Sequence, residues 1–193
     1  MLGNASTIQL LAWLAVAAVA VHAASTISLH WLVPGVNPLS EMVSAYLNTA
    51  YQWLSRLSFV ALACALGLIA TALALRHVQG VMFIIALILV AIAAIGLLVV
   101  AVAPGAARTV AGPTQPAAVL ALLLLSLVLR HEPAWQSAGP VLLGLSLGLV
   151  TLFVVTIMLR VMPAAGLGGL ANRAVLVLIY SWIVLVARGL MKP

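Results

Sequence analysis

Long apolar runs separated by short polar segments dominate the chain. Six of these runs approach or exceed the length of about 20 residues that a helix needs to cross a bilayer. The predicted spans are residues 8–32, 57–75, 81–103, 114–129, 141–159 and 170–187. Because no soluble stretch of any length separates them, the pattern predicts an all-α fold. We expect one polytopic membrane domain over residues 1–193, a bundle of six transmembrane helices.

One polar stretch, residues 38–54 after the first span, repeats its apolar residues with the i, i+3, i+4, i+7 spacing of a helix face. Asn37 and Pro38 form a typical helix start, with Asn as the N-cap and Pro at the first position. Tyr46 and Trp53 are aromatic residues typical of the lipid headgroup level. The pattern predicts an amphipathic interfacial helix, and the alternative is a polar-faced cap packed over the bundle.

Composition points to the same environment. Hydrophobic residues make up 66% of the chain, charged residues 5%, and the mean hydropathy is +1.34, which leaves too little polar surface for a soluble domain. The net charge of +6 does not indicate nucleic-acid binding, because the arginines lie at the ends of apolar runs, where they meet phosphate headgroups. Arg76, Arg130 and Arg188 each end a predicted span. They favour a multi-pass protein of the inner or cytoplasmic cell membrane with both termini in the cytoplasm.

His22 lies near the middle of the first predicted span, where a titratable side chain is a functional hypothesis by default. A haem held there would need a second imidazole at similar depth, and the other histidines lie nearer the span ends, so no cofactor is predicted. With no Asp and one Cys in the chain, no metal site is predicted either. We expect a neutral histidine hydrogen-bonded to Ser25, Thr26, Tyr180 or Ser181.

Glu41 is one of two acidic residues, and Arg56 and Arg173 are the cations predicted on its side of the membrane. A carboxylate–arginine pair there would either bind a lipid headgroup or only attach the surface helix to the bundle, and attachment is favoured. A catalytic role would require a second acid or base nearby, so no catalytic residue is predicted. Together with Tyr46 and Trp53, these residues form the predicted binding face for membrane lipid, a partner membrane protein or a second copy of the chain.

Three functions stay open at this point. A non-enzymatic protein that binds lipid or a partner through this face is favoured. A small transporter or permease-like protein with His22 and Tyr180 at a midplane site is the second hypothesis, and a membrane enzyme acting on lipid or quinone, with Glu41 as acid or base, is the third. The sequence contains no H-E-x-x-H, G-x-S-x-G, P-loop or Rossmann glycine motif.

Several short elements occur in an order that is found in a known family. They are VSAY at residues 43–46, YQWL at 51–54, GLANR at 169–173, and Trp182 within the last span. With the spacing of the six spans, they make nearly the whole chain resemble the bacterial integral membrane proteins grouped as domain-of-unknown-function family 998. The resemblance implies a six-span architecture, and, because that family has no established activity, it implies no particular reaction.

The chain departs from the pattern of that family at three places. Members often carry an acidic residue just before the loop tyrosine, another after a proline that closes the third span, and a histidine at the start of the fourth span. This chain has Ala45 at the first place, Gly105 and Ala106 after Pro104 at the second, and Gln115 at the third. If those groups form an active centre in the family, the resemblance implies that this member has lost it or diverged.

Overall fold

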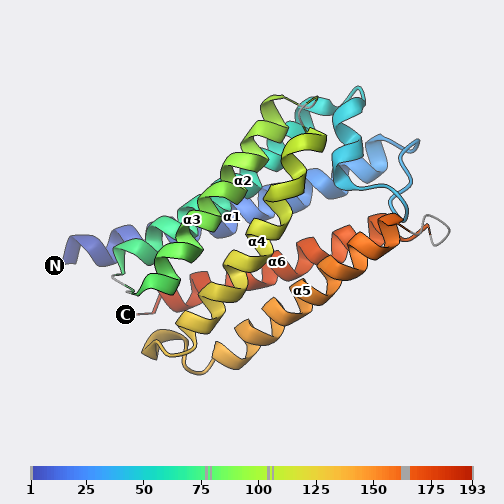
Figure 1. Ribbon diagram of the computed structural model, residues 1–193. Helices are drawn as coiled ribbons and strands as arrows, with labels where there is room; N and C mark the ends of the chain where they lie inside the picture. Colours follow the sequence, from blue (N-terminus) through green and yellow to red (C-terminus); the bar gives the residue numbers. More distant parts are fainter. Residues whose placement is uncertain are drawn as a thin grey trace.

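Six long α-helices make up most of the protein in the computed structural model (Figure 1). The structure describes residues 2–76, 78, 80–103, 105, 107–161 and 166–192, so Pro104 and Ala106 lie outside it. The helices are α1 (Leu2–Leu32), α2 (Gln52–Leu75), α3 (Val81–Val102), α4 (Ala107–Leu129), α5 (Gly139–Val161) and α6 (Gly168–Leu190), with two 3-10 helices, η1 (Val43–Asn48) and η3 (Pro133–Trp135). These ranges contain no strand, and the predicted all-α class is confirmed.

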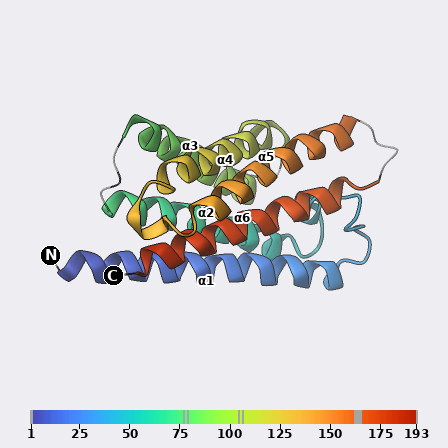
Figure 2. The same ribbon diagram turned by 90° about the horizontal axis from the view of Figure 1, so that it is seen from below.

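The helices form a ring in which each packs against its neighbours in sequence, and α6 returns to pack against α1. Consecutive helices run antiparallel, so the two termini lie at the same end of the bundle, with α1 and α6 side by side (Figures 1 and 2). The segment of residues 33–51, called the cover segment below, lies at the opposite end, beside the start of α6 (Figure 1).

The outer surface of the bundle is apolar. On α3, for example, five isoleucines are between 43% and 60% exposed; they are Ile84, Ile85, Ile88, Ile92 and Ile95. Five helices, namely α1, α2, α3, α5 and α6, contain apolar stretches long enough to cross a membrane, whereas the apolar part of α4, Pro113–Leu129, is shorter. The protein therefore has the form of a multi-pass membrane protein, and the predicted span at residues 114–129, which lies on α4, stays a prediction.

Polar side chains inside the bundle connect different helices. Trp182 Nε1 of α6 donates a hydrogen bond to Ser126 Oγ of α4 at 2.7 Å, and Ser126 Oγ lies 2.7 Å from Ser146 Oγ of α5. All three side chains are fully buried. Because a buried polar group without a partner is costly, this network fixes α4, α5 and α6 against one another.

The single amphipathic helix predicted over residues 38–54 is not formed. Asn37 Oδ1 accepts a hydrogen bond from the Leu39 N–H at 3.0 Å, and Glu41 Oε1 accepts one from the Asn37 N–H at 3.2 Å, so a turn replaces the first part of the helix. Such side-chain bonds to the backbone compete with helix formation. The 3-10 helix η1 follows the turn, and α2 begins at Gln52.

Candidate functional site

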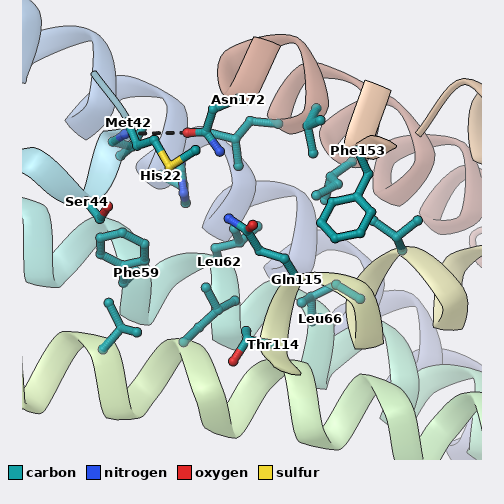
Figure 3. A pocket seen from close by; sticks show the side chains of 18 of the residues that line it. His22, Met42, Ser44, Phe59, Leu62, Leu66, Thr114, Gln115, Phe153 and Asn172 are labelled. Atoms are coloured by element: carbon teal, nitrogen blue, oxygen red, sulfur yellow. Dashed lines mark hydrogen bonds between the residues drawn. The ribbon is translucent and has the colours of Figure 1, made fainter. Parts of the chain in front are cut away.

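A cavity of about 380 Å³ lies inside the ring of helices, next to the cover segment (Figure 3). Its volume falls within the range of small-molecule sites. All six helices contribute to its wall, and Met42, Val43 and Ser44 contribute from the cover segment. Most of the lining residues are apolar, and the polar ones are His22, Ser44, Thr114, Gln115, Thr156 and Asn172.

His22 of α1 is the titratable side chain among the described residues that line the cavity. Its Nδ1 lies 2.7 Å from the hydroxyl of Tyr180 on α6 and 3.3 Å from the hydroxyl of Thr26. The Thr26 hydroxyl also lies 3.2 Å from Ser58 Oγ of α2. We assign the Tyr180 hydrogen to the bond with Nδ1, which places the ring proton on Nε2. In this tautomer Nε2 of His22 carries an N–H donor, and the His22 side chain lines the cavity.

Asn172 of α6 and Gln115 of α4 extend into the same cavity (Figure 3). Asn172 Oδ1 accepts a hydrogen bond from the Val43 N–H at 3.4 Å, so the Asn172 NH₂ group keeps its donors for the cavity. The described lining contains no acidic residue, lysine or arginine. The cavity thus combines apolar walls with neutral hydrogen-bond donors.

Arg173, the next residue on α6, attaches the cover segment to the bundle. Its Nε donates to His30 Nε2 of α1 at 2.7 Å, and its Nη1 donates to the main-chain oxygens of Glu41 at 2.8 Å and Gly169 at 2.9 Å. His30 Nδ1 lies 2.5 Å from the Thr26 main-chain oxygen, so Nδ1 carries the ring proton and Nε2 is free to accept. Arg173 is therefore held by neutral acceptors from two other elements and its own helix.

The start of α6 also lies directly against the cover segment. The Leu170 N–H donates to the Leu39 main-chain oxygen at 2.9 Å. At Gly169, a Cβ atom would collide with the main-chain oxygens of Pro38 and Glu41, so this approach of two backbones requires glycine. The polar contacts of α6 thus reach the backbone of the cover segment, and its side chains Val36, Val43 and Tyr46 are buried in a cluster with Leu29 of α1.

The residues of the predicted binding face are only partly brought together. The Tyr46 hydroxyl lies 3.5 Å from Arg173 Nη2, but the Tyr46 side chain is fully buried and so is not exposed to lipid headgroups. Glu41 meets Arg173 through its main-chain oxygen, whereas its carboxylate accepts the Asn37 N–H. The predicted carboxylate–arginine pair is therefore not formed.

Two other members of that face lie apart from this cluster. Arg56 Nη2 donates to Gln52 Oε1 of its own helix at 3.2 Å, and its buried Nε has no partner. Trp53 is exposed on the first turn of α2. Neither contributes to the described lining of the cavity.

The predicted intramembrane polar residues divide in a similar way. His22 and Tyr180 meet, with ring centroids 5.4 Å apart, as the sequence predicted. Ser181 instead donates to a main-chain oxygen of its own helix at 2.9 Å. Gln115 and Asn172 were not among the predicted site residues, and the only signal for them was their place in the family pattern.

Two of the four elements behind the family resemblance contribute to the cavity wall. Ser44 comes from the VSAY element, Asn172 comes from the GLANR element, and Gln115 stands where the family resemblance leads us to expect a histidine. No curated protein and no solved structure matches the chain. The model of one family matches residues 16–189, which is most of the chain and includes every described residue that lines the cavity. The protein therefore belongs to the family described as "Protein of unknown function (DUF998)".

Proposed function

We propose that the protein binds a neutral, membrane-dissolved molecule whose head carries acceptor oxygens, such as a quinone or an acylglycerol. The observation that carries the proposal is an apolar cavity inside an apolar helical bundle that offers N–H donors from His22 and Asn172. A charged headgroup would lie there without a counter-charge in the described lining, which is strongly unfavourable.

The positions of the donors suit a ligand that lies along the bundle axis. His22 lies ten residues before the end of α1, or about 15 Å, which is half of a hydrocarbon core of about 30 Å. Asn172 lies four residues into α6, or about 6 Å from its start. A head group placed between them would leave its apolar chain against the leucine and phenylalanine side chains of the wall.

This proposal keeps lipid binding, the function that the sequence favoured, but moves it from the outer face of the cover segment to its inner side. The third hypothesis, an enzyme acting on lipid or quinone with Glu41 as acid or base, receives less support. The Glu41 carboxylate is exposed and faces the Asn37 N–H, and Glu41 is not among the residues that line the cavity. A neutral histidine whose Nδ1 is occupied by the Tyr180 hydroxyl is a stronger argument for binding than for acid–base catalysis.

Native mass spectrometry of the protein in mild detergent, with identification of the small molecules released, tests the proposal. We expect one neutral lipophile per chain. His22→Phe and Asn172→Leu each remove one donor at similar volume and should each reduce retention about tenfold, because an unmade hydrogen bond to a buried polar group costs about 1–3 kcal/mol.

His131→Phe is the matched control, because His131 is exposed just beyond the end of α4 and contacts Arg130. Its retention of the lipophile should equal that of the unchanged protein. The proposal is wrong if only charged lipids are released, or if both cavity variants retain the neutral lipophile fully.

A further inference from the structure

A second space, of about 370 Å³, lies between α1 and α6 and is called the outer groove here. It opens to the surroundings, because Ile27 and Val177 on its two walls are 60% and 58% exposed. Ala23 and Leu176 add to its apolar lining. The hydrogen-bonded pair of Tyr180 and His22 separates it from the interior cavity, since Tyr180 lines the groove and His22 lines the cavity.

Arg173 supplies a positive charge at one end of this groove. Its hydrogen-bond partners are a neutral imidazole, two main-chain oxygens and the Tyr46 hydroxyl, and it forms no ion pair within the described chain. The contact of Nη2 with that hydroxyl is long, at 3.5 Å, which leaves donor capacity on this nitrogen. Glu41 contacts Arg173 through its main-chain oxygen, but its carboxylate accepts the Asn37 N–H instead of pairing with the guanidinium.

Along the helix axes, the charged end and the apolar walls of the groove follow the order of headgroup and acyl chains in a phospholipid. Arg173 lies five residues from the start of α6, about 7.5 Å, and Tyr180 lies about 10 Å deeper on the same helix. Trp31, which is 83% exposed, lies one residue before the end of α1 and lines the same end as Arg173. A cation and an exposed tryptophan at the helix ends above apolar walls are typical of the headgroup level above acyl chains.

We propose that the outer groove is a binding site for one anionic phospholipid, with its phosphate on Arg173 and an acyl chain between α1 and α6. No acidic side chain is among the described residues that line the groove, so nothing there would pair with the ammonium group of a zwitterionic lipid. This site does not depend on the function proposed for the interior cavity, because it takes a ligand of different charge and, although Leu176 lines both spaces, its other lining residues do not line the cavity.

The test is native mass spectrometry after reconstitution with equal amounts of phosphatidylglycerol and phosphatidylcholine. We expect one tightly retained lipid, with phosphatidylglycerol favoured about fivefold, which is the preference that one cation near an anionic surface supplies. Arg173→Gln should remove this preference. Inorganic phosphate at millimolar concentration should not displace the lipid, and displacement would show a site for a free anion instead.

Val177→Trp fills the outer groove while leaving Arg173 and the cavity lining unchanged, so it keeps the proposal testable if Arg173→Gln does not fold. We expect it to abolish retention of phosphatidylglycerol. Val154→Trp, at an exposed position of α5 away from the groove, is the control and should retain the lipid. Equal binding of the two lipids, or full retention by Val177→Trp, would overturn the proposal.

Discussion

Replacing Arg173 by glutamine should loosen the cover segment over the cavity while the helices stay in place. Arg173 connects α6 to α1 through His30, and it connects α6 to the cover segment through the Glu41 main-chain oxygen. A glutamine side chain is shorter and uncharged, so it cannot make both connections. The substitution therefore removes a tie on the cover segment without disturbing an apolar contact of the core.

The bond from Arg173 to the Glu41 main-chain oxygen, at 2.8 Å, determines the size of the effect. A hydrogen bond from a charged group contributes about 1.5–3 kcal/mol, and about 1.4 kcal/mol corresponds to a factor of ten in an equilibrium. Other ties remain, among them the bond from Leu170 N–H to the Leu39 oxygen, the bond from Val43 N–H to Asn172 and the buried side chains of the cover segment. We therefore expect the cover segment to open about ten to a hundred times more often, rather than to detach.

Hydrogen–deuterium exchange measured by mass spectrometry in nanodiscs would detect this opening. The amides of Glu41, Val43 and Ala45 are hydrogen-bonded within or from the cover segment, so peptides that contain them should exchange faster in Arg173→Gln. Arg56→Gln is the matched control, because Arg56 loses the same charge but bonds only to its own helix. Its cover segment should exchange as in the unchanged protein.

Two outcomes would count against this reasoning. Unchanged exchange of the cover segment in Arg173→Gln would refute the assigned role of the guanidinium, since its bond to Glu41 would then contribute nothing measurable. Faster exchange throughout α1 and α6 would show a general loss of structure rather than the local opening expected here.

Two further substitutions test the packing around the cavity. Ser126→Ala should lower the free energy of unfolding in SDS titration by about 1–2 kcal/mol, because it leaves the buried Trp182 N–H without its acceptor. Ser181→Ala, whose hydroxyl bonds its own helix, should change it by less than about 0.5 kcal/mol, and equal effects would contradict the assignment. Gly169→Ala should lower the melting temperature and speed exchange in the cover segment, because its Cβ would collide with the Glu41 oxygen; an unchanged exchange rate would refute the close approach.

The sequence predicted the positions of the long helices well, because the hydrophobicity of a span is a local property of the chain. The third predicted span, residues 81–103, differs by one residue from α3. The start of α4 was placed too late, because the polar stretch before Pro116 resembles a loop, whereas the helix begins at Ala107 and contains two prolines. The prediction of the amphipathic helix was wrong for a different reason. The side chains of Asn37 and Glu41 accept hydrogen bonds from nearby backbone N–H groups, and the start of α6 donates a hydrogen bond to the backbone of the same segment.

The site was harder to predict because it depends on how the helices are rotated in the ring. The meeting of His22 and Tyr180 could be expected, because both are polar residues at similar depth in apolar spans. Nothing in the local pattern indicated that Gln115 and Asn172 face the same space. The partners of Arg173 were predicted wrongly. The sequence shows which carboxylates could pair with it, but it does not show that main-chain oxygens accept its hydrogen bonds in the folded protein.

The two ends of the bundle differ in a way that bears on the transporter hypothesis. Ser126 lies one turn beyond Leu122, the last α4 residue in the cavity wall. The buried hydrogen-bond network of Ser126 with Trp182 therefore closes the bundle on the side of the cavity away from the cover segment. Further along, Arg76 Nη1 donates to the Gly189 oxygen at 3.1 Å. Alternating access would require these buried interhelical bonds to separate, whereas the other end of the cavity is covered by a single segment, held by hydrogen bonds to α6 and by the buried side chains of Val36, Val43 and Tyr46. A cavity closed at one end by a buried interhelical network favours binding over passage through the bundle.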